Sequence, residues 1–316
     1  MITPLLFADH AVDPDTRAFL ATFAARTRNA PSVVNTPIPA LRAARANGSA
    51  ALQIVKLDSA GNEVISGPDG DLPLRSFTPE RPRGAFLHFH GGGFVMGAPD
   101  QQDVLLDTVA AESGLAVISA GYRLAPEWPF PAASDDALAA ALWFIDAARA
   151  GRFNGGPLFI GGESAGAYLV VTTLLRLRAM GLADSFRAAV LNYGVFDLGL
   201  TPSARNWGDR YAIISTPILR RYVDAFLPSG VDLRSPEVSP FYARLDALPP
   251  ALFSVGTRDP LLDDSLLMSQ RWIAAGNEAT LAVYPGGIHA FSAFDIPIAA
   301  DALRRQVEFL RGHSTP

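Results

Sequence analysis

The segment Gly162-Glu-Ser-Ala-Gly166 lies between a short apolar run, Leu158–Ile160, and a stretch with the apolar spacing of a helix that includes Tyr168 and Leu169. A serine on a sharp turn between a strand and a helix has its hydroxyl exposed above the edge of the sheet, where it can act as a nucleophile. The flanking glycines are needed because a side chain at either position would clash in so tight a turn. This stretch therefore predicts an α/β fold with Ser164 as the nucleophile.

Short apolar runs and helical stretches alternate along most of the chain. The strand-like runs are Gly84–His90, Leu115–Ala120, Pro157–Ile160, Ala188–Leu191, Ala251–Val255 and Ala279–Tyr284. Strands that are apolar on both faces and separated by helices are typical of a parallel sheet covered on both sides. Two earlier runs, Ala51–Leu57 and Leu72–Thr78, are separated by turn residues and predict antiparallel strands. We therefore expect a mostly parallel central sheet of about eight strands flanked by helices.

Two segments do not follow this alternation. Residues 1–45 are alanine-rich and have a helical pattern that prolines interrupt near its end. Residues 197–240 lie between two predicted core strands, and Thr216-Pro217 begins an apolar helical stripe that ends at Pro228. Long insertions in compact domains are often functional. We expect this insertion to form a lid or cap over a site, the alternative being a packing extension of the core.

The composition excludes several classes of protein. The chain has 316 residues, 49% of them hydrophobic, which is enough for a sizeable core. A net charge of −5 argues against a nucleic acid or an anionic membrane as partner. The absence of cysteine excludes disulfides, cysteine-ligated metals and a thiol nucleophile. The N-terminus does not resemble a signal peptide and no stretch reaches the ~18 apolar residues of a membrane span, so we expect a soluble, cytoplasmic protein.

A glycine-rich loop, His90-Gly-Gly-Gly-Phe94, directly follows a predicted strand. Consecutive glycines let backbone N–H groups converge on one point, which acyl transfer needs because the carbonyl oxygen becomes an anion in the tetrahedral intermediate. We expect the N–H groups of Gly92, Gly93 and Ala165 to form this oxyanion hole. The alternatives are a plain flexible loop or a phosphate-binding loop. No Lys-Ser/Thr pair follows, however, and the Gly-x-Gly-x-x-Gly spacing fails at Met96.

A serine nucleophile on such a turn requires an acid and then a histidine later in the chain. His289 is the histidine in the right place, because it lies just beyond the last predicted strand. Asp259 follows the preceding predicted strand, at the edge where ligand chemistry in open α/β sheets gathers. Asp197 is the rival acid. Asp263 and Asp264 begin the next predicted helix, where negative charge stabilises the N-terminus.

Together these groups predict nucleophilic catalysis. His289 removes the Ser164 proton as the hydroxyl attacks an ester carbonyl, Asp259 orients the imidazole, and water later releases the acid from the acyl-enzyme. This chemistry needs no metal or organic cofactor, and no ligand cluster for a metal is visible in the sequence.

The sequence resembles the hormone-sensitive lipase family of carboxylesterases, which has the α/β-hydrolase fold. The resemblance rests on the pairing of His90–Phe94 with Gly162–Gly166, and it runs from about residue 50 to residue 311. It is strengthened by the motifs Tyr122-Arg-Leu-Ala-Pro-Glu127, Pro129-Phe-Pro-Ala132, Asp259-Pro-Leu261 and His289-Ala-Phe291, which follow the family's order.

The resemblance implies a mostly parallel sheet in a catalytic domain of residues 46–316, with a helical cap formed from residues 1–45 and the insertion at about 197–240. It places the nucleophile, acid and base on Ser164, Asp259 and His289. It also implies hydrolysis of short- to medium-chain acyl esters, and many members form dimers. Glu163 stands where the family often has aspartate. We interpret it either as a polar neighbour that tunes the nucleophile or as a structural hydrogen-bond partner in the turn.

The substrate pocket is predicted from residues beside the strand ends and in the expected cap. Its expected walls are Phe94, Val195, Phe196, Trp207, Tyr211, Ile288 and Phe291. The expected partner is a small-molecule ester, and a homodimer is a further expectation. Two other functions stay open: an amidase or formamidase that uses the same triad, and a non-catalytic small-molecule receptor of the same fold.

Overall fold

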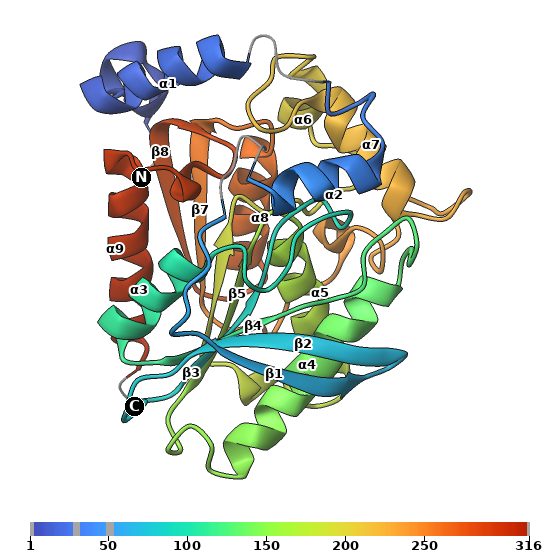
Figure 1. Ribbon diagram of the computed structural model, residues 1–316, viewed down its shortest axis with the longest axis vertical. Helices are drawn as coiled ribbons and strands as arrows, with labels where there is room; N and C mark the ends of the chain where they lie inside the picture. Colours follow the sequence, from blue (N-terminus) through green and yellow to red (C-terminus); the bar gives the residue numbers. More distant parts are fainter. Residues whose placement is uncertain (1–2, 28–31, 49–53, 315–316) are drawn as a thin grey trace.

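A sheet of eight strands runs through the computed structural model, which describes residues 3–27, 32–48 and 54–314 (Figure 1). The strands are β1 Gly61–Gly67, β2 Gly70–Phe77, β3 Ala85–Phe89, β4 Ala116–Ala120, β5 Leu158–Glu163, β6 Ala188–Asn192, β7 Ala251–Arg258 and β8 Ala279–Ile288. Their order across the sheet is β1-β2-β4-β3-β5-β6-β7-β8. β2 is antiparallel to β1 and β4, and the remaining pairs are parallel. The prediction of a mostly parallel sheet of about eight strands is confirmed.

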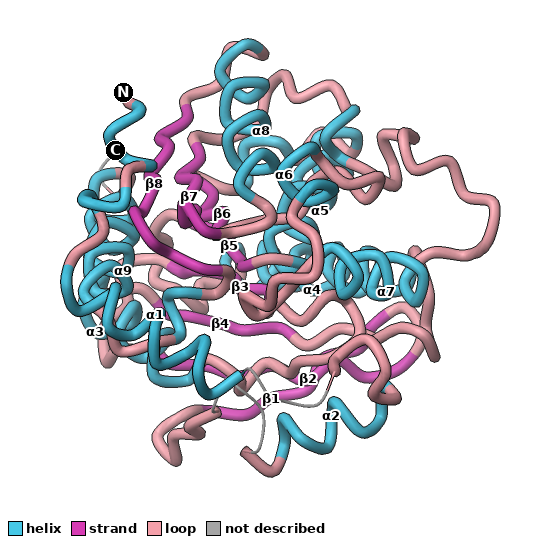
Figure 2. The backbone as a smooth tube through the Cα atoms, turned by 90° about the horizontal axis from the view of Figure 1, so that it is seen from above, coloured by secondary structure: helices cyan, strands magenta, loops and turns pink. Residues whose placement is uncertain are grey.

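Helices cover both faces of this sheet (Figure 2). They are α1 Pro14–Thr27, α2 Ile38–Ala46, α3 Asp103–Ser113, α4 Ala132–Arg149, α5 Ala165–Ala179, α6 Pro202–Asn206, α7 Thr216–Phe226, α8 Leu262–Ala274 and α9 Pro297–Gly312. α3 and α9 pack together on one face, and α4, α5 and α8 cover the other.

The central strands are buried along their whole length because both faces are covered. In β3, Phe86 belongs to an apolar cluster with Leu106 of α3 and Leu310 of α9. Its neighbour Leu87 belongs to the cluster on the other face, with Phe144 of α4. Successive side chains of a strand point to opposite faces, so a sheet covered on both sides requires apolar residues at consecutive positions.

The first antiparallel strand lies further along the chain than the sequence predicted. Of the predicted strand Ala51–Leu57, the first three residues lie outside the described part of the chain, and residues 54–57 form no strand within it. The N–H of Leu57 instead donates to Asp103 at 2.8 Å, and its carbonyl accepts from Arg75 at 2.7 Å. Side chains therefore use the backbone groups that strand pairing would need. The hairpin partner of β2 is β1, a largely exposed edge strand in which the apolar pattern is weak.

Helices α2 and α7 lie over the carboxyl ends of the parallel strands, although they are far apart in the sequence (Figure 1). Arg42 of α2 donates to the carbonyls of Val95 and Ala125, both at 2.7 Å, and forms a bidentate ion pair with Glu127. Arg221 of α7 donates to a backbone carbonyl just ahead of α2 at 2.8 Å. These contacts hold α2 and α7 at the same edge of the sheet.

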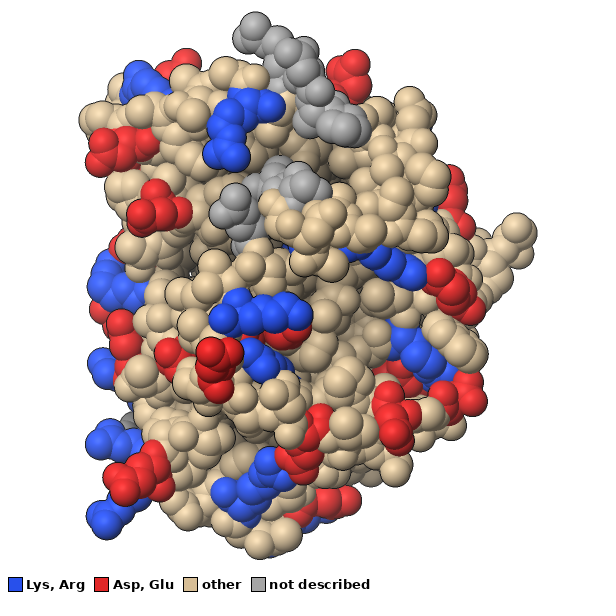
Figure 3. Space-filling model, viewed as in Figure 1, with Lys and Arg blue, Asp and Glu red and all other residues tan. Residues whose placement is uncertain are grey.

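Charged side chains of both signs are interspersed on the face shown in Figure 3. Many charged residues form ion pairs, including Arg123 with Asp69 at 2.9 Å and Arg152 with Glu63 at 2.5 Å. Such partly exposed pairs contribute at most about 1 kcal/mol each, because water and salt screen them. The stability of the fold therefore depends mainly on the apolar clusters on the two faces of the sheet.

Asp264, in the first turn of α8, is a buried carboxyl group that holds the loop after β6. It accepts hydrogen bonds from the backbone N–H groups of Phe196 (2.6 Å) and Asp197 (3.0 Å) and from the Thr201 hydroxyl (2.6 Å). Burial raises the pKa of Asp264 to about 7, and the hydrogen bonds act in the opposite direction. We expected the negative charge of Asp264 to stabilise the N-terminus of its own helix. Its hydrogen bonds instead connect that helix to a neighbouring loop.

We predict that Asp264→Asn makes the stability of the protein less dependent on pH. A carboxyl group whose pKa is raised in the folded state contributes stability that is complete below its unfolded value of 3.8 and is lost as the pH rises through about 7. Asparagine keeps an oxygen that can accept from Phe196 and Asp197, and it does not ionise. Between about pH 5 and about pH 8, the free energy of unfolding in urea is expected to fall less in the variant than in the wild type.

The matched control is Asp184→Asn, because Asp184 is exposed. This variant is expected to keep the pH dependence of the wild type. An equal pH dependence in wild type and Asp264→Asn would contradict the prediction, because it would show that the Asp264 carboxyl group does not titrate in this range.

Candidate active site

Ser164 lies on a strained turn between the last residue of β5 and the first residue of α5. Its backbone has φ 55° and ψ −117°, and such a conformation costs about 1–3 kcal/mol in a residue other than glycine. A Cβ added at Gly162 would lie 2.6 Å from the Phe89 carbonyl oxygen, and one added at Gly166 would lie closer still. Both glycines are required because β3 passes directly beside the turn.

His289 follows β8 and Asp259 follows β7, so both side chains start from the same edge of the sheet as Ser164. The Nε2 atom of His289 lies 2.9 Å from Ser164 Oγ, and Nδ1 lies 2.9 Å from the nearer oxygen of Asp259. With the carboxylate at Nδ1, this nitrogen donates to Asp259, and Nε2 accepts from the Ser164 hydroxyl. The imidazole and the carboxylate are both buried. The structure brings the three residues named from the sequence into one hydrogen-bonded series.

The Asp259 carboxylate is also held by its own chain, because it accepts from the backbone N–H of Leu261 at 2.8 Å. Asp197, the rival acid, has other partners. Its carboxylate accepts from the Tyr242 hydroxyl at 3.0 Å, and no hydrogen bond joins it to His289 within the described part of the chain. The geometry therefore favours Asp259 over Asp197 as the partner of the imidazole.

The glycine loop after β3 has backbone conformations that side chains disfavour. Gly92 has φ 135° and Gly93 has φ 62°. A Cβ on Gly93 would overlap the ring of Tyr222, and one on Gly92 would overlap a backbone carbonyl. Both glycines line the same cavity as Ser164, and Ala165 follows the serine as the first residue of α5. Because the N–H groups in the first turn of a helix lack acceptors within the helix, Ala165 can offer its own to a ligand.

Glu163, directly before the nucleophile, connects the turn to the glycine loop. Its Oε1 accepts from the backbone N–H of Gly91 (2.8 Å) and from the side-chain amide of Gln102 (2.7 Å), and its Oε2 lies 2.7 Å from His88 Nε2. His88 Nδ1 in turn lies 3.0 Å from the Ser119 hydroxyl. Of the two interpretations left open by the sequence, these contacts favour the structural one, because the carboxylate fixes the first glycine of the loop.

His90, at the start of the loop, is neutral and has a structural role. It is buried, and this burial lowers its pKa to about 4. Its ring stacks on Tyr122 with ring centroids 4.2 Å apart, and the Tyr122 hydroxyl donates to the His90 carbonyl at 2.7 Å. The motif that begins at Tyr122 therefore supports the start of the glycine loop.

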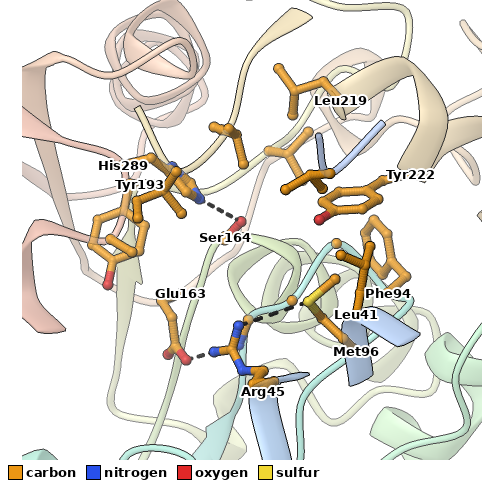
Figure 4. A pocket seen from close by; sticks show the side chains of 18 of the residues that line it. Leu41, Arg45, Phe94, Met96, Glu163, Ser164, Tyr193, Leu219, Tyr222 and His289 are labelled. Carbon is orange, nitrogen blue, oxygen red and sulfur yellow. Dashed lines mark hydrogen bonds between the residues drawn. The ribbon is translucent and has the colours of Figure 1, made fainter. Parts of the chain in front are cut away.

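A cavity of about 430 Å³ has Ser164 and His289 in its lining and lies between the sheet edge and helices α2 and α7 (Figure 4). Most of the other lining side chains are apolar or aromatic, among them Leu41, Met96, Tyr193, Leu219 and Tyr222. Three of the predicted wall residues, Phe94, Val195 and Tyr211, also line it. Volumes of about 300–1,000 Å³ are typical of sites for small molecules.

Phe196 and Ile288, predicted as walls of the pocket, pack away from this cavity in the described structure. Each is next to a residue that lines it, Val195 and His289 respectively, and neighbours on an extended chain point to opposite sides. Phe196 is buried in the main core, and Ile288 packs in a small cluster with Phe23 of α1.

Trp207 and Phe291 also lie outside the cavity lining of the described residues. The Trp207 indole donates to the Arg210 carbonyl at 2.8 Å, and the Arg210 guanidinium lies 4.4 Å from the centre of its ring. Phe291 is fully buried beside Tyr284 and Ile296. The sequence could not place these two side chains, because a position near a strand end does not determine which way the following loop turns.

Several lining residues were not identified as part of the pocket from the sequence. Leu219 and Tyr222 belong to the apolar stripe of α7, and this stripe was the signal that could have identified them. Arg45, at the end of α2, had no such signal, because a basic residue in the last turn of a helix is common on protein surfaces. Gln101 and Gln102 likewise have no distinctive pattern.

Within residues 3–27, 32–48 and 54–314, no three or more His, Asp or Glu side chains are grouped so that they could hold a metal ion. In the same part of the chain, every helix is too short or too polar to cross a membrane.

Comparison with known proteins finds similar sequences and structures. A family model described as the alpha/beta hydrolase fold matches residues 86–293. An ethyl acetate hydrolase of Pseudomonas putida is 33% identical over 251 residues, covering 77% of this chain and 79% of that protein. An acetyl esterase of Salmonella typhi is 31% identical over 251 residues, covering 78% of each. Among solved structures, an esterase of Pyrobaculum calidifontis matches with a TM-score of 0.85 and 27% identity, covering 96% of this chain and 100% of that one.

We predict that Ser164 is the residue that reacts with an organophosphate such as diethyl p-nitrophenyl phosphate. The Ser164 hydroxyl lies in hydrogen-bond contact with an imidazole that can take its proton. Intact-mass spectrometry is expected to show one added diethylphosphoryl group with release of p-nitrophenolate, and peptide mapping to place it on Ser164. Ser164→Ala is expected to show no such addition.

His289→Ala leaves the hydroxyl in place but removes the base. Its labelling is expected to be slower by about 10²-fold or more, the usual contribution of a positioned base. Labelling of another residue, or labelling of His289→Ala at the wild-type rate, would contradict the activation of Ser164 by His289.

Proposed function

This chain belongs to the α/β-hydrolase family and is a carboxylic ester hydrolase, and we propose that Ser164, His289 and Asp259 are its catalytic triad. The observation that carries the proposal is the series in which His289 contacts the Ser164 hydroxyl and the Asp259 carboxylate, each at 2.9 Å. We also propose that the chain is a member of the hormone-sensitive lipase family, on the motifs His90–Phe94 and Gly162–Gly166.

In the proposed reaction, Ser164 Oγ attacks the ester carbonyl carbon while His289 Nε2 takes the hydroxyl proton. The tetrahedral intermediate collapses, the bond to the alcohol oxygen breaks, and His289 gives the proton to the leaving alcohol. A water molecule then attacks the acyl-enzyme, again losing a proton to His289, and the acid leaves as Ser164 recovers its proton. Asp259 holds the imidazole in the required tautomer and stabilises its charged form. The proposed mechanism uses no cofactor.

The oxyanion of each intermediate is proposed to accept from the N–H groups of Gly92, Gly93 and Ala165. These donors are backbone groups, so they need no rearrangement when the negative charge develops. The conformations of Gly92 and Gly93, which a side chain would prevent, support this role. Removing one donor from such a hole costs about 2.7–4 kcal/mol of transition-state stabilisation.

The proposed substrates are small-molecule esters with short to medium acyl chains. The largely apolar cavity of about 430 Å³ suits such groups, and two relatives are named ethyl acetate hydrolase and acetyl esterase. We propose that residues 1–45 and the insertion at about 197–240 act as the cap of this site, on a catalytic domain of residues 46–316. The contributions of α2 and α7 to the lining support that division.

The alternative is an amidase or formamidase, because the same triad can protonate an amine leaving group. The names of the relatives favour esters. The other alternative is a non-catalytic receptor of this fold. Binding alone does not require the complete hydrogen-bonded series of Ser164, His289 and Asp259. A location in the cytoplasm and a homodimer stay predictions from the sequence.

The test is a series of p-nitrophenyl esters from acetate to palmitate, hydrolysed by the wild type and by Ser164→Ala. The value of kcat/KM is expected to be highest for short acyl chains, because the cavity limits their length. It is expected to fall by about 10⁴-fold or more in Ser164→Ala. No turnover of any ester by a folded wild type would overturn the proposal, and hydrolysis of the matching p-nitroanilides instead would favour the amidase.

A second prediction concerns Glu163 as a positioning residue for the glycine loop. Glu163→Ala removes the acceptor that holds the Gly91 N–H, and it is expected to lower kcat by about tenfold or more with a smaller change in KM. The loop N–H groups contribute most when the oxyanion forms, which is why kcat is the affected constant.

Glu163→Gln is the matched control, because its amide oxygen can still accept from Gly91. It is expected to keep most of the wild-type kcat. If both variants lose kcat equally, the charge of Glu163 rather than its hold on the loop is what the reaction requires.

A further inference from the structure

One side of the active-site cavity is polar, in contrast to the rest of its lining. Arg45 at the end of α2 and the consecutive residues Gln101 and Gln102 all line the cavity that contains Ser164. In Figure 4, the Arg45 side chain reaches from α2 to a place beside Glu163 and Met96, below Ser164 in that view. The proposed ester hydrolysis uses none of Arg45, Gln101 and Gln102 in its chemical steps.

Each of these three side chains has a buried polar atom without a partner. Arg45 Nε, Gln101 Oε1 and Gln102 Oε1 have no hydrogen-bond partner among the residues that the structure describes. Buried polar atoms in native proteins are nearly always hydrogen-bonded, so each exception needs an explanation. Three exceptions in the lining of one cavity indicate a place where a ligand completes the hydrogen bonding.

The orientation of both glutamine amides is determined by their other contacts. The Gln101 nitrogen donates to the Gly91 carbonyl at 3.1 Å, and the Gln102 nitrogen donates to Glu163 at 2.7 Å. Both partners are acceptors, so the amide nitrogens must face them, and the amide oxygens are the atoms left over. Among the described residues, the one hydrogen bond of the Arg45 guanidinium is a weak contact of Nη1 with the Met96 sulfur at 3.8 Å. The polar side therefore offers donors from Arg45 and acceptors from the two glutamines.

The guanidinium of Arg45 lies beside a carboxylate, because Glu163 also lines this part of the cavity. Burial lowers the pKa of the Arg45 guanidinium, whereas attraction to the Glu163 carboxylate acts in the opposite direction. An added anion would meet this carboxylate and the two glutamine oxygens as well as the guanidinium. A hydroxyl group fits better, because its oxygen can accept from Arg45 while its hydrogen is donated to a glutamine oxygen.

We propose that Arg45, Gln101 and Gln102 bind a hydroxyl group of the substrate, so that the preferred substrates are neutral esters with a hydroxyl on the alcohol or the acyl part. The inference rests on the proposed esterase function and adds the substrate class to it. Arg45 is then a specificity residue supplied by the N-terminal segment, and the apolar remainder of the cavity holds the rest of the ester.

The test uses pairs of esters in which a methyl group replaces the hydroxyl. For the alcohol part the pair is 2-hydroxyethyl acetate and propyl acetate, and for the acyl part it is ethyl 3-hydroxybutanoate and ethyl 3-methylbutanoate. In at least one pair, the wild type is expected to prefer the hydroxyl ester by about tenfold in kcat/KM, although a purely apolar pocket would prefer the methyl ester. The pair that shows the preference identifies which part of the ester carries the hydroxyl.

Arg45→Met is expected to lower this preference by about tenfold or to reverse it, because it replaces the donor with an unbranched apolar side chain. Arg45→Lys keeps the charge without the Nε donor and is expected to give an intermediate ratio. Arg220→Met is the matched control, because Arg220 is an exposed residue of α7 outside the cavity lining. It is expected to leave the ratio unchanged.

Two results would overturn the inference. One is a wild type that hydrolyses the methyl esters as well as or better than both hydroxyl esters. The other is a preference for monoethyl succinate over the hydroxyl esters, which would show that the guanidinium recognises an anion. In both cases esters are still hydrolysed, so these outcomes are distinct from a failure of the proposed function, in which no ester is a substrate.

Discussion

The strained backbone of Ser164 is the constraint on which the rest of the site depends. Its φ of 55° is held by the Ser164 N–H, which donates to the Asn192 carbonyl at 2.9 Å, and by glycines that let β3 pass at contact distance. Because β3, β5 and β6 are adjacent parallel strands, this turn and the glycine loop meet at one edge of the sheet. A side chain at Gly166 would push β3 away and separate the serine from the loop that faces it.

Around this turn, some buried polar groups have hydrogen-bond partners within the described protein, and others have none. Asp259 has His289 and a backbone N–H as partners, and Glu163 has His88, Gln102 and the N–H of Gly91. These groups hold the reacting atoms in place, because a buried carboxylate with several donors cannot move without losing them. The unsatisfied atoms of Arg45, Gln101 and Gln102 belong instead to side chains that line the cavity, where we propose that substrate binds. In the proposed mechanism, catalysis and specificity would therefore use different polar atoms of one pocket.

Ser164, Asp259 and His289 could be named from the sequence because each directly follows a recognisable strand. A parallel sheet brings the carboxyl ends of its strands to one edge, so the order of strands and motifs already predicts that the three side chains meet.

The pocket walls could not be predicted in this way. Val195 lines the cavity, but Phe196 packs in the core, although both are apolar residues in the same loop. The direction of each side chain depends on how the loop is held by groups such as Asp264 on α8.

The sequence by itself determined the sheet, the turn at Ser164 and the three residues proposed as the triad, because these follow from the apolar pattern and from glycines that act within a few residues of themselves. Only the tertiary structure decided that Arg45 lines the cavity of Ser164 and that Glu163 binds the glycine loop. It also decided that the backbone groups of Leu57, predicted to be in a strand before β1, form hydrogen bonds with Arg75 and Asp103. The physical reason is that such contacts join segments far apart in the chain, and no local pattern records which segments pack together.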